Sequence, residues 1–304
     1  MGLTSIITVN FNQPGATLEF LKSIKENTLD EDVEVILVDN GCSENYQSEF
    51  EATFPGLVYI RSEKNLGFAG GNNLGIKQAK GAFLLFLNND TEITPNLVRV
   101  LKAELANNKD IGLISPLILF FDKPEIIQYA GFSEMNYLTC RNKSIGGFTL
   151  NKGQYESDSR QTGYCHGAAM MCRAADLALA GLMDEHYFLY YEELDWCEKF
   201  RGVGKQIWFT GKTSILHKES ISVGKESAIK TYFMTRNRAL FIRKNTGVLN
   251  TLIFSFYYFT IASPKQIYLY IKKGRADLAK WVFKGLWWNI THSTSSNQLG
   301  FKIK

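Results

Sequence analysis

Residues 83–90 read FLLFLNND, an apolar run of five residues that ends in two asparagines and an aspartate. A short apolar run without polar alternation is typical of a strand that is buried on both faces of a parallel sheet. Earlier runs of the same kind lie at residues 5–9, 33–38 and 57–60. We therefore expect residues 83–87 to form the fourth strand of such a sheet.

Helical patterns separate these runs. Leu18, Leu21 and Ile24 share one helical face, residues 72–79 fit a short helix, and residues 95–106 begin with a proline, which suits a first helical turn. The alternation of strands and helices predicts an α/β fold with a doubly wound, mostly parallel sheet flanked by helices.

The second half of the chain is less regular, and residues 118–162 predict loops and minor strands. Beyond them we expect a strand at 165–172, a helix at 174–180 that ends at Gly181, a helix at 193–200 and the last strand at 206–210. The whole predicts one catalytic domain, residues 1–222, followed by a helical extension, residues 223–304.

Composition and charge narrow the class of protein. The net charge is only +4, from 34 basic and 30 acidic residues, which argues against a nucleic-acid partner. The five cysteines form no CxxC pair, and the N-terminus lacks the features of a secretory signal. We therefore expect free thiols and a cytoplasmic location.

The last quarter of the chain is rich in aromatic residues. Residues 245–264 carry no charge, but their apolar centre, 252–262, has eleven residues, whereas a membrane span needs about 20. Residues 267–288, IYLYIKKGRADLAKWVFKGLWW, mix aromatics with lysines, as in a helix at a lipid headgroup interface. Two alternatives stand: peripheral contact with the inner face of the membrane, or packing on the catalytic domain or on a second copy in a homodimer.

Polar residues follow each of the predicted strands. In doubly wound sheets ligands bind beyond the carboxyl ends of the strands, and there the chain places Asn10, Asp39, the loop NLGFAGGNN at 65–73, and Asn88 to Asp90. Asp39 could accept hydrogen bonds from a uracil or thymine imide or from a ribose; the alternative is a turn or a helix cap.

The glycines of the loop at 65–73 permit close backbone approach to a ligand or positive φ angles. Their GxxGG spacing matches neither the dinucleotide fingerprint GxGxxG nor the Walker pattern, which argues against a dehydrogenase and a P-loop enzyme.

A cation site is predicted at the end of the fourth strand. The Asp90 carboxylate could bridge a divalent cation, Mg²⁺ or Mn²⁺, to a diphosphate, and the imidazole of His217, after the last strand, could complete the site. The alternatives are an ordinary turn at Asp90 and a histidine that merely satisfies a polar neighbour.

Three carboxylates gather in YYEELDWC at residues 190–197. Crowding in a partly apolar site raises the pKa of at least one of them toward the range of a general base. Glu193 is the predicted base and Asp195 the substitute; the alternative is the acidic start of a surface helix.

Taken in order, these motifs resemble the family 2 glycosyltransferases with the GT-A fold, in particular their bacterial rhamnosyltransferase-like branch. The resemblance covers residues 5–244 and rests on SIITVNFN, VILVDNGCSEN, NLGFAGGNNLGI, LLFLNND, GAAMMCR, FLYYEELDWCEKFRGVGKQIWF, ILHKES and TRNRALFIRKN.

The resemblance implies a role for each matching position. The nucleotide-sugar pocket would be lined by Asn10, Asp39, Asn65, Gly67, Gly70, Asn72 and Asn89. Asp90 would take the last place of a DxD-like motif, with His217 as a further metal or diphosphate contact, and Glu193 would be the acceptor-activating base. Two departures are NND in place of DxD, and Glu in place of the usual Asp as the base.

The function implied is an inverting transfer of a sugar, L-rhamnose from dTDP-rhamnose, to a hydroxyl of a polysaccharide or lipid-linked glycan by a metal-assisted single displacement. The alternatives are a UDP-hexose donor, a non-catalytic nucleotide-sugar or carbohydrate-binding module, and a metal-dependent nucleotidyltransferase. The last gives no role to the carboxylates near Glu193.

Overall fold

The computed structural model describes residues 2–28, 32–218 and 226–303. Its strands form one sheet, and they are β1 (Thr4–Asn10), β2 (Val33–Asn40), β3 (Val58–Ser62), β4 (Phe83–Leu87), β5 (Thr91–Ile93), β6 (Ile111–Phe120), β7 (Lys123–Tyr129), β8 (Ser159–Gln161), β9 (Ala169–Arg173) and β10 (Gln206–His217). The helices of the α/β part are α1 (Pro14–Asn27), α2 (Gln47–Thr53), α3 (Gly67–Ile76), α4 (Leu97–Asn107), α5 (Ala174–Ala180) and α6 (Glu192–Gly202). The C-terminal helices are α7 (Ala228–Asn245), α8 (Val248–Tyr257), the π-helical turn η1 (Tyr258–Ala262), α9 (Ser263–Lys272) and α10 (Ala276–Thr291).

The sheet is parallel in its first half and mixed in its second. Its order is β3-β2-β1-β4-β9-β6-β10-β5, with β7 on β6 and β8 on β10. Strands β3, β2, β1 and β4 run parallel, so their carboxyl ends share one edge. Strand β9 runs antiparallel to β4 and pairs Ala169 with Leu87, which brings the turn before β9 to the same edge. Strand β10 ends there too, because His217 pairs with Thr91 of β5.

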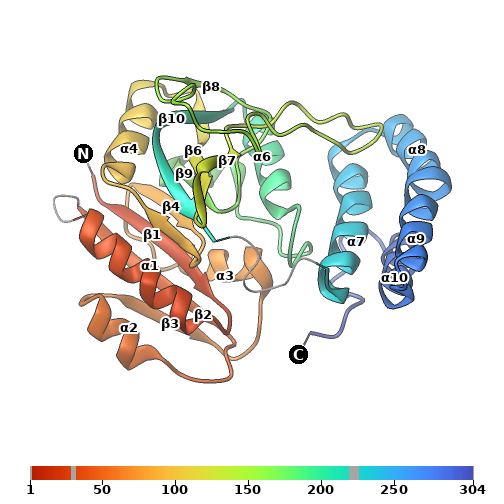
Figure 1. The fold of residues 1–304 in the computed structure, drawn as a ribbon, viewed down its shortest axis with the longest axis horizontal. Helices are drawn as coiled ribbons and strands as arrows, with labels where there is room; N and C mark the ends of the chain where they lie inside the picture. Colours follow the sequence, from red (N-terminus) through yellow and green to blue (C-terminus); the bar gives the residue numbers. More distant parts are fainter. Residues whose placement is uncertain (1, 29–31, 219–225, 304) are drawn as a thin grey trace.

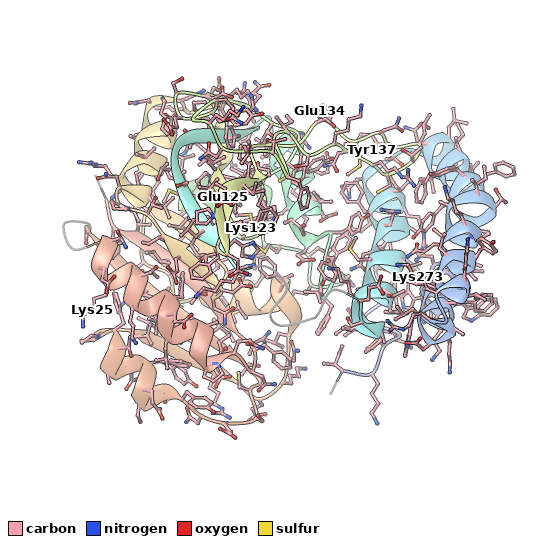
Figure 2. The ribbon with its side chains drawn as sticks, in the orientation of Figure 1. Lys25, Lys123, Glu125, Glu134, Tyr137 and Lys273 are labelled. Atoms are coloured by element: carbon pink, nitrogen blue, oxygen red, sulfur yellow. The ribbon has the colours of Figure 1, made fainter. Side chains whose placement is uncertain are left out.

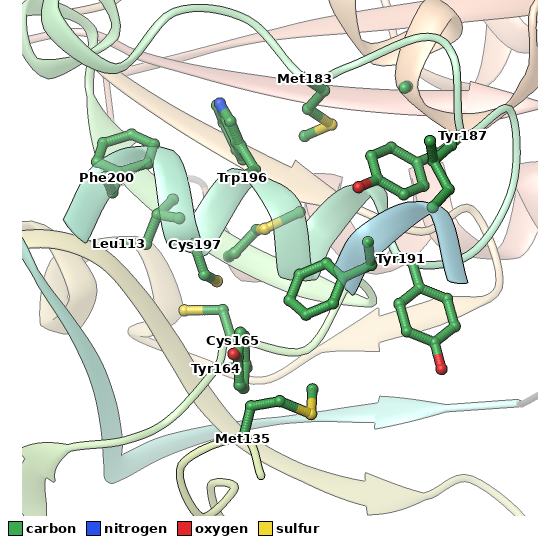
Figure 3. Packing of buried hydrophobic residues seen from close by; sticks show 14 of the residues in the cluster. Leu113, Met135, Tyr164, Cys165, Met183, Tyr187, Tyr191, Trp196, Cys197 and Phe200 are labelled. Carbon is green, nitrogen blue, oxygen red and sulfur yellow. The ribbon is translucent and has the colours of Figure 1, made fainter. Parts of the chain in front are cut away.

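Buried side chains alternate between the two faces of the sheet. Ile6 of β1 belongs to the apolar cluster under α1, α2 and α4, whereas its neighbour Ile7 belongs to the cluster under α3, α5 and α6. Trp196 of α6 is fully buried and meets Phe86 of β4 edge-on at 5.2 Å between ring centroids. Figure 3 shows how Trp196, Cys197 and Phe200 of α6 pack into this second cluster.

The predicted strands of the first half and the predicted α/β class are confirmed, and β4 has the predicted bounds. Helix α3 differs, because it begins at Gly67, so most of the predicted glycine loop is helical. Strand β6 was not predicted, since Gly112 and Pro116 interrupt its apolar pattern, although every residue except its last, Phe120, is buried in the sheet.

Two later strands differ from their predicted bounds. The strand predicted at 165–172 begins only at Ala169, and β10 runs past the predicted 206–210 to His217. Helix α7 is the first helix of the predicted helical extension, residues 223–304, whose first three residues, 223–225, lie outside the described residues.

Helix α7 lies between the sheet domain and the outer helices α8, α9 and α10 (Figure 1). Leu240 and Phe241 of α7 share an apolar cluster with Trp196 of α6. The predicted domain boundary at 222/223 lies in 219–225, outside the described residues, and stays a prediction. Within the described ranges, no helix combines the length and the apolar character that crossing a membrane requires. All five cysteines are free and buried.

Candidate active site

A cleft of about 530 Å³ opens at the edge where the strand ends meet. It is lined by side chains from the ends of β1 and β4, from α3, from the turn before β9, from the start of α6, from the end of β10 and from the first turn of α7. Of the predicted site residues, it is lined by Asn65, Gly67, Asn72, Asn89, Asp90, Glu193 and His217, and Asn10, Asp39, Gly70 and Asp195 are not among its lining residues.

Asp90 and His217 face each other in the cleft. The pairing of β10 with β5 brings His217 Nε2 to 3.2 Å from Asp90 Oδ1. His217 Nδ1 lies 2.8 Å from the side-chain oxygen of Gln128, an acceptor, which assigns the imidazole proton to Nδ1. In that tautomer the Nε2 lone pair points toward the carboxylate, so both side chains can offer an electron pair to a cation.

This arrangement fits a divalent cation. Asp90 Oδ1 is buried and, apart from His217 Nε2 at 3.2 Å, has no polar partner among the residues described, so it can accept a further ligand. Gln128 orients His217 in the way that a second hydrogen bond orients most metal-binding histidines. No group of three His, Cys, Asp or Glu residues in the described ranges could hold a metal by itself. The pair therefore suits a cation whose remaining ligands are phosphate and water.

Helix α6 presents two carboxylates to the cleft. Glu192 and Glu193 are its first residues, and both line the cleft. Burial raises the pKa of Glu193, and burial together with the charge of Glu193 raises the pKa of Glu192 well above its usual range. Glu192 Oε2 is buried and has no hydrogen-bond partner within the part of the chain that is described. The repulsion favours a pair in which Glu192 holds the proton and Glu193 is ionised.

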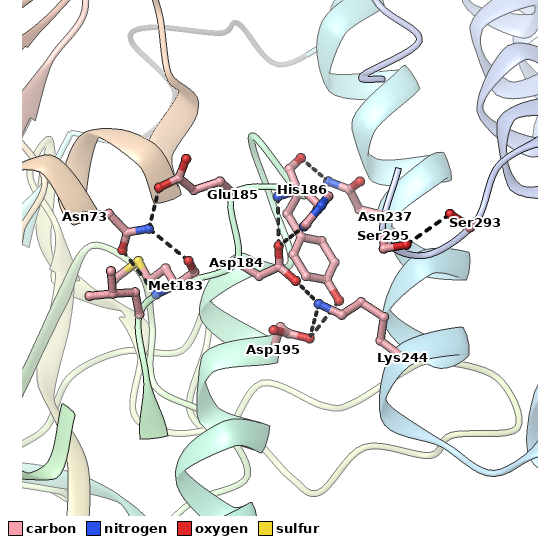
Figure 4. Close-up of polar contacts among 12 residues, drawn as sticks. Asn73, Met183, Asp184, Glu185, His186, Asp195, Asn237, Lys244, Ser293 and Ser295 are labelled. Carbon is pink, nitrogen blue, oxygen red and sulfur yellow. Dashed lines mark hydrogen bonds and ion pairs between the residues drawn. The ribbon is translucent and has the colours of Figure 1, made fainter. Parts of the chain in front are cut away.

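Asp195 belongs to a different network. Its Oδ1 accepts hydrogen bonds from the Tyr187 hydroxyl at 2.9 Å and from Asn245 Nδ2 at 2.8 Å, and it lies 3.6 Å from Lys244 Nζ. Figure 4 shows Asp195 turned toward Lys244 of α7. The structure therefore brings Glu193, and not Asp195, into the cleft with Asp90.

The side chains of Asp39 and Asn10 are buried at the ends of β2 and β1, where they bond to neighbouring loop residues. The Asp39 carboxylate accepts from Cys42 N at 3.0 Å and from the Tyr59 hydroxyl at 2.6 Å, and it pairs with Arg61 at 3.4 Å. Asn10 Oδ1 accepts from the backbone N of Gln13 and lies 3.4 Å from Asn89 Nδ2. Both side chains are buried, and the contacts seen hold loops in place.

Gly67 has a positive φ of +73°, one of the two conformational uses predicted for the glycines of its loop. A Cβ at this position would lie 2.1 Å from the carbonyl oxygen of Phe188, which accepts a hydrogen bond from Phe68 N at 2.7 Å. Gly70 lies inside α3, where a Cβ would meet Leu66 at 2.8 Å. These glycines allow the chain to approach other parts of the protein closely.

A strained aromatic loop precedes α6 and borders the cleft. Phe188, Tyr190 and Tyr191 have φ angles of 65°, 68° and 76°, each costing on the order of 1–3 kcal/mol for a residue with a side chain. Asn237 Nδ2 of α7 lies 2.8–2.9 Å from the carbonyl oxygens of residues 187, 189 and 190. Helix α7 thus holds the loop that leads into Glu193, and Figure 4 shows Asn237 of α7 bonded to this loop.

Replacing Asn237 by leucine is expected to lower the free energy of unfolding by about 2–4 kcal/mol, because buried carbonyls lose their donor. Urea unfolding followed by circular dichroism measures the change. Asn107→Leu, at an exposed asparagine that ends α4, is the matched control and should change stability by less than about 0.5 kcal/mol. Equal effects at both positions would contradict a holding role for Asn237.

Sequence reasoning missed His166 and Gln128. His166 lies in the turn before β9, lines the cleft and packs against His217 with ring centroids 5.9 Å apart. Ala168 N donates to His166 Nδ1 at 3.1 Å, and burial lowers the pKa of His166 to about 3, so the ring stays neutral with its proton on Nε2. The segment 165–172 was predicted to be a strand, so His166 was taken for a structural residue and not for a site residue. Gln128 lies in a segment whose pattern predicts only loops and minor strands.

Residues 5–177, more than half of the chain, match the profile of the family described as glycosyl transferase family 2. The chain belongs to glycosyl transferase family 2. The predicted family is thereby confirmed.

Similar proteins are about a quarter identical to this chain over the parts that match. A low-salt glycan biosynthesis hexosyltransferase of Haloferax volcanii is 26% identical, and the match spans 68% of this chain and 66% of the relative. An N-acetylglucosaminyl-diphospho-decaprenol L-rhamnosyltransferase of Mycobacterium tuberculosis is 23% identical over 73% of this chain and 78% of its own length. A dTDP-rhamnosyl transferase of Shigella flexneri is 24% identical over 79% of this chain and 82% of its own length.

Solved structures share the fold. GalNAc-T7 with UDP, GalNAc and Mn²⁺ has a TM-score of 0.67 at 17% identity, over 96% of this chain and 57% of that chain. A mannosyltransferase of Pyrobaculum calidifontis with GDP-Man and Mn²⁺ has a TM-score of 0.60 at 10% identity, over 95% of this chain and 87% of that chain. The fold of this family 2 member is therefore the GT-A fold, with C-terminal helices added.

Proposed function

We propose that this family 2 protein is an inverting glycosyltransferase that moves a sugar from a nucleotide-diphosphate donor to an acceptor hydroxyl. The observation that carries the proposal is the meeting, in one cleft, of Asp90 and His217 with a carboxylate of raised pKa, Glu193. Asp90 and His217 suit a cation that binds a diphosphate, and Glu193 suits the removal of a proton.

The proposed reaction is a single displacement. Glu193 accepts the proton of the acceptor hydroxyl, the acceptor oxygen bonds to the anomeric carbon, and the bond from that carbon to the diphosphate oxygen breaks. A divalent cation, Mg²⁺ or Mn²⁺, held by Asp90 and His217 would neutralise the charge on the departing diphosphate. Asn65, Asn72 and Asn89 line the cleft with amide groups that suit a nucleotide.

Asp39 and Asn10 are also proposed as nucleotide contacts, although both are buried and neither lines the cleft. The Asp39 carboxylate has acceptor capacity beyond the contacts it makes, so a base or ribose that reaches the end of β2 could still bind it.

The proposed donor is dTDP-L-rhamnose, and the proposed acceptor is a lipid-linked glycan or a polysaccharide. The support is the likeness to one relative named a dTDP-rhamnosyl transferase and to another that names a diphospho-decaprenol acceptor. A UDP-hexose is the second candidate, because a solved structure of the same fold contains UDP and GalNAc.

The deciding experiment measures transfer or slow hydrolysis of a panel of dTDP- and UDP-sugars by the purified protein. Each donor is assayed with Mg²⁺, Mn²⁺ or EDTA. We expect one donor to be turned over in the presence of a cation and not with EDTA. Binding of a donor without turnover under any condition would favour a non-catalytic module, and no binding of any donor would overturn the proposal.

The pH dependence of the reaction follows from the raised pKa of Glu193. The base works only when ionised, and its pKa lies above the ordinary glutamate range, so kcat/KM should fall on the acid side through a pKa higher than that of a free glutamate. His166 adds no inflection near neutral pH, because its pKa is about 3. A pH–rate profile checks this; an acid limb at the ordinary glutamate pKa would contradict it.

A further inference from the structure

The outer C-terminal helices are apolar on two opposite faces. Helix α8 turns Phe254 inward, stacked on Tyr258 at 5.0 Å, and both side chains are almost fully buried. Its other face carries large apolar side chains at helical spacing, and 43–70% of each is exposed: Leu249, Leu252, Ile253 and Phe256. A surface helix normally has a polar outer face, so an apolar one indicates a contact with something other than water.

The same pattern continues along the chain. Helices α8, η1 and α9 follow one another without a break from Val248 to Lys272, and α9 exposes Tyr268, Leu269 and Ile271. Helix α10 packs on α7 and α9, buries Val282 and Trp288, and exposes Phe283, Trp287 and Ile290. We call the exposed apolar residues of α8, η1, α9 and α10 the outer face.

The C-terminal part of the chain carries mostly basic charges. From residue 245 to the end of the chain the basic residues are Lys265, Lys272, Lys273, Arg275, Lys280, Lys284, Lys302 and Lys304, and the one acidic residue is Asp277. Asp277 is paired with Arg275 at 3.0 Å. Lys273, labelled in Figure 2, pairs with Glu226, whereas no ion pair is seen for Lys272, Lys280 or Lys284 among the described residues.

We propose that the outer face docks on an anionic lipid surface. Exposed Phe, Trp, Tyr and Leu side chains flanked by lysines suit the boundary between acyl chains and anionic headgroups. The helices would lie on the membrane, consistent with their lacking a segment able to cross it. Lys284 lies 4.4 Å from the ring centroid of Trp281, so a cation and an indole are side by side on α10.

A second copy of the chain is the less suitable occupant. In a two-fold dimer the same surface meets itself, so the lysines of one copy would face the lysines of the other, and the nearby carboxylates Glu226 and Asp277 are already paired with Lys273 and Arg275. An anionic bilayer compensates the lysines of the outer face without that repulsion. The inference does not depend on the proposed reaction, because it uses none of the cleft residues.

Flotation with lipid vesicles tests the proposal on the full chain. The native protein is mixed with vesicles of phosphatidylcholine alone or of phosphatidylcholine with phosphatidylglycerol. We expect it to float with the anionic vesicles, more weakly with the neutral ones, and less as salt is raised. Lys272→Gln/Lys284→Gln should weaken the partition to anionic vesicles by roughly 20- to 30-fold. Phe256→Ser/Trp287→Ser should weaken binding to both.

Matched variants on the catalytic domain serve as controls. Lys22→Gln/Lys77→Gln changes two exposed lysines, and Leu179→Ser changes a leucine that is 63% exposed on α5. These should float like the native protein, and unchanged thermal unfolding would show that every variant is folded. Absence of flotation, or equal flotation of the lysine and control variants, would overturn the proposal. A native dimer that dissociates in Phe256→Ser/Trp287→Ser, without vesicle binding, would assign the outer face to a second copy.

Discussion

Changing Glu193 to glutamine is expected to lower sugar transfer by roughly 10²–10⁴-fold, the range by which a general base accelerates a reaction. Glutamine keeps the size of the side chain but cannot accept the acceptor proton. Donor binding should persist, because the proposed nucleotide contacts come from other elements of the cleft. The measurement is kcat for transfer together with the Kd of the donor by calorimetry.

Comparing Glu193→Gln with variants of the two nearby carboxylates, Glu192 and Asp195, identifies which of the three is the base. Asp195→Asn should lower stability more than kcat, because Asp195 accepts hydrogen bonds from Tyr187 and Asn245 outside the cleft. Glu192→Gln should retain most activity, since Glu192 holds the proton of the pair in our assignment. If Glu193→Gln turned over normally and Glu192→Gln did not, the base would be Glu192.

Changing Asp90 to asparagine is expected to reduce transfer by about 10²–10³-fold, comparable to the loss of one group that stabilises transition-state charge. The asparagine keeps the shape of the side chain but removes the negative charge that a cation needs. Binding of Mn²⁺ in the presence of a nucleotide diphosphate, followed by electron paramagnetic resonance, should weaken in parallel, which gives a readout independent of turnover.

The same variant should not be destabilised. In the native protein Asp90 Oδ1 lies 3.2 Å from His217 Nε2, and the side-chain amide of an asparagine could donate a hydrogen bond to that nitrogen. We expect unchanged or slightly higher thermal stability, since functional sites often oppose stability. Glu92→Gln, on β5 and paired with Lys218 at 3.1 Å, is the control and should keep cation binding. Full activity of Asp90→Asn would exclude Asp90 as the cation ligand.

The local sequence pattern was enough to predict the bounds of a strand where a short apolar run is followed directly by a polar turn. The run FLLFL followed by NND has the same bounds in the structure as in the prediction, and Asp90 lies in the cleft. The start of α6 was predicted within one residue, because its acidic first turn is a local signal. Strand β6 was missed, because Gly112 and Pro116 break its pattern and only its pairing with β9 and β10 shows it.

Residue types and spacing along the chain were thus enough to predict the α/β sheet, and to place Asp90 and Glu193 as candidates for the cation ligand and the base, since each of these predictions depends on contiguous residues. Long-range pairing was needed to show that His217 faces Asp90, that His166 and Gln128 join them, and that Asp195 turns toward Lys244. The physical reason is that the direction of a side chain depends on strand register and on helix packing. The partners that set them here are distant in sequence: His217 contacts Gln128, 89 residues away, and pairs with Thr91, 217 − 91 = 126 residues away, so no local pattern reaches them.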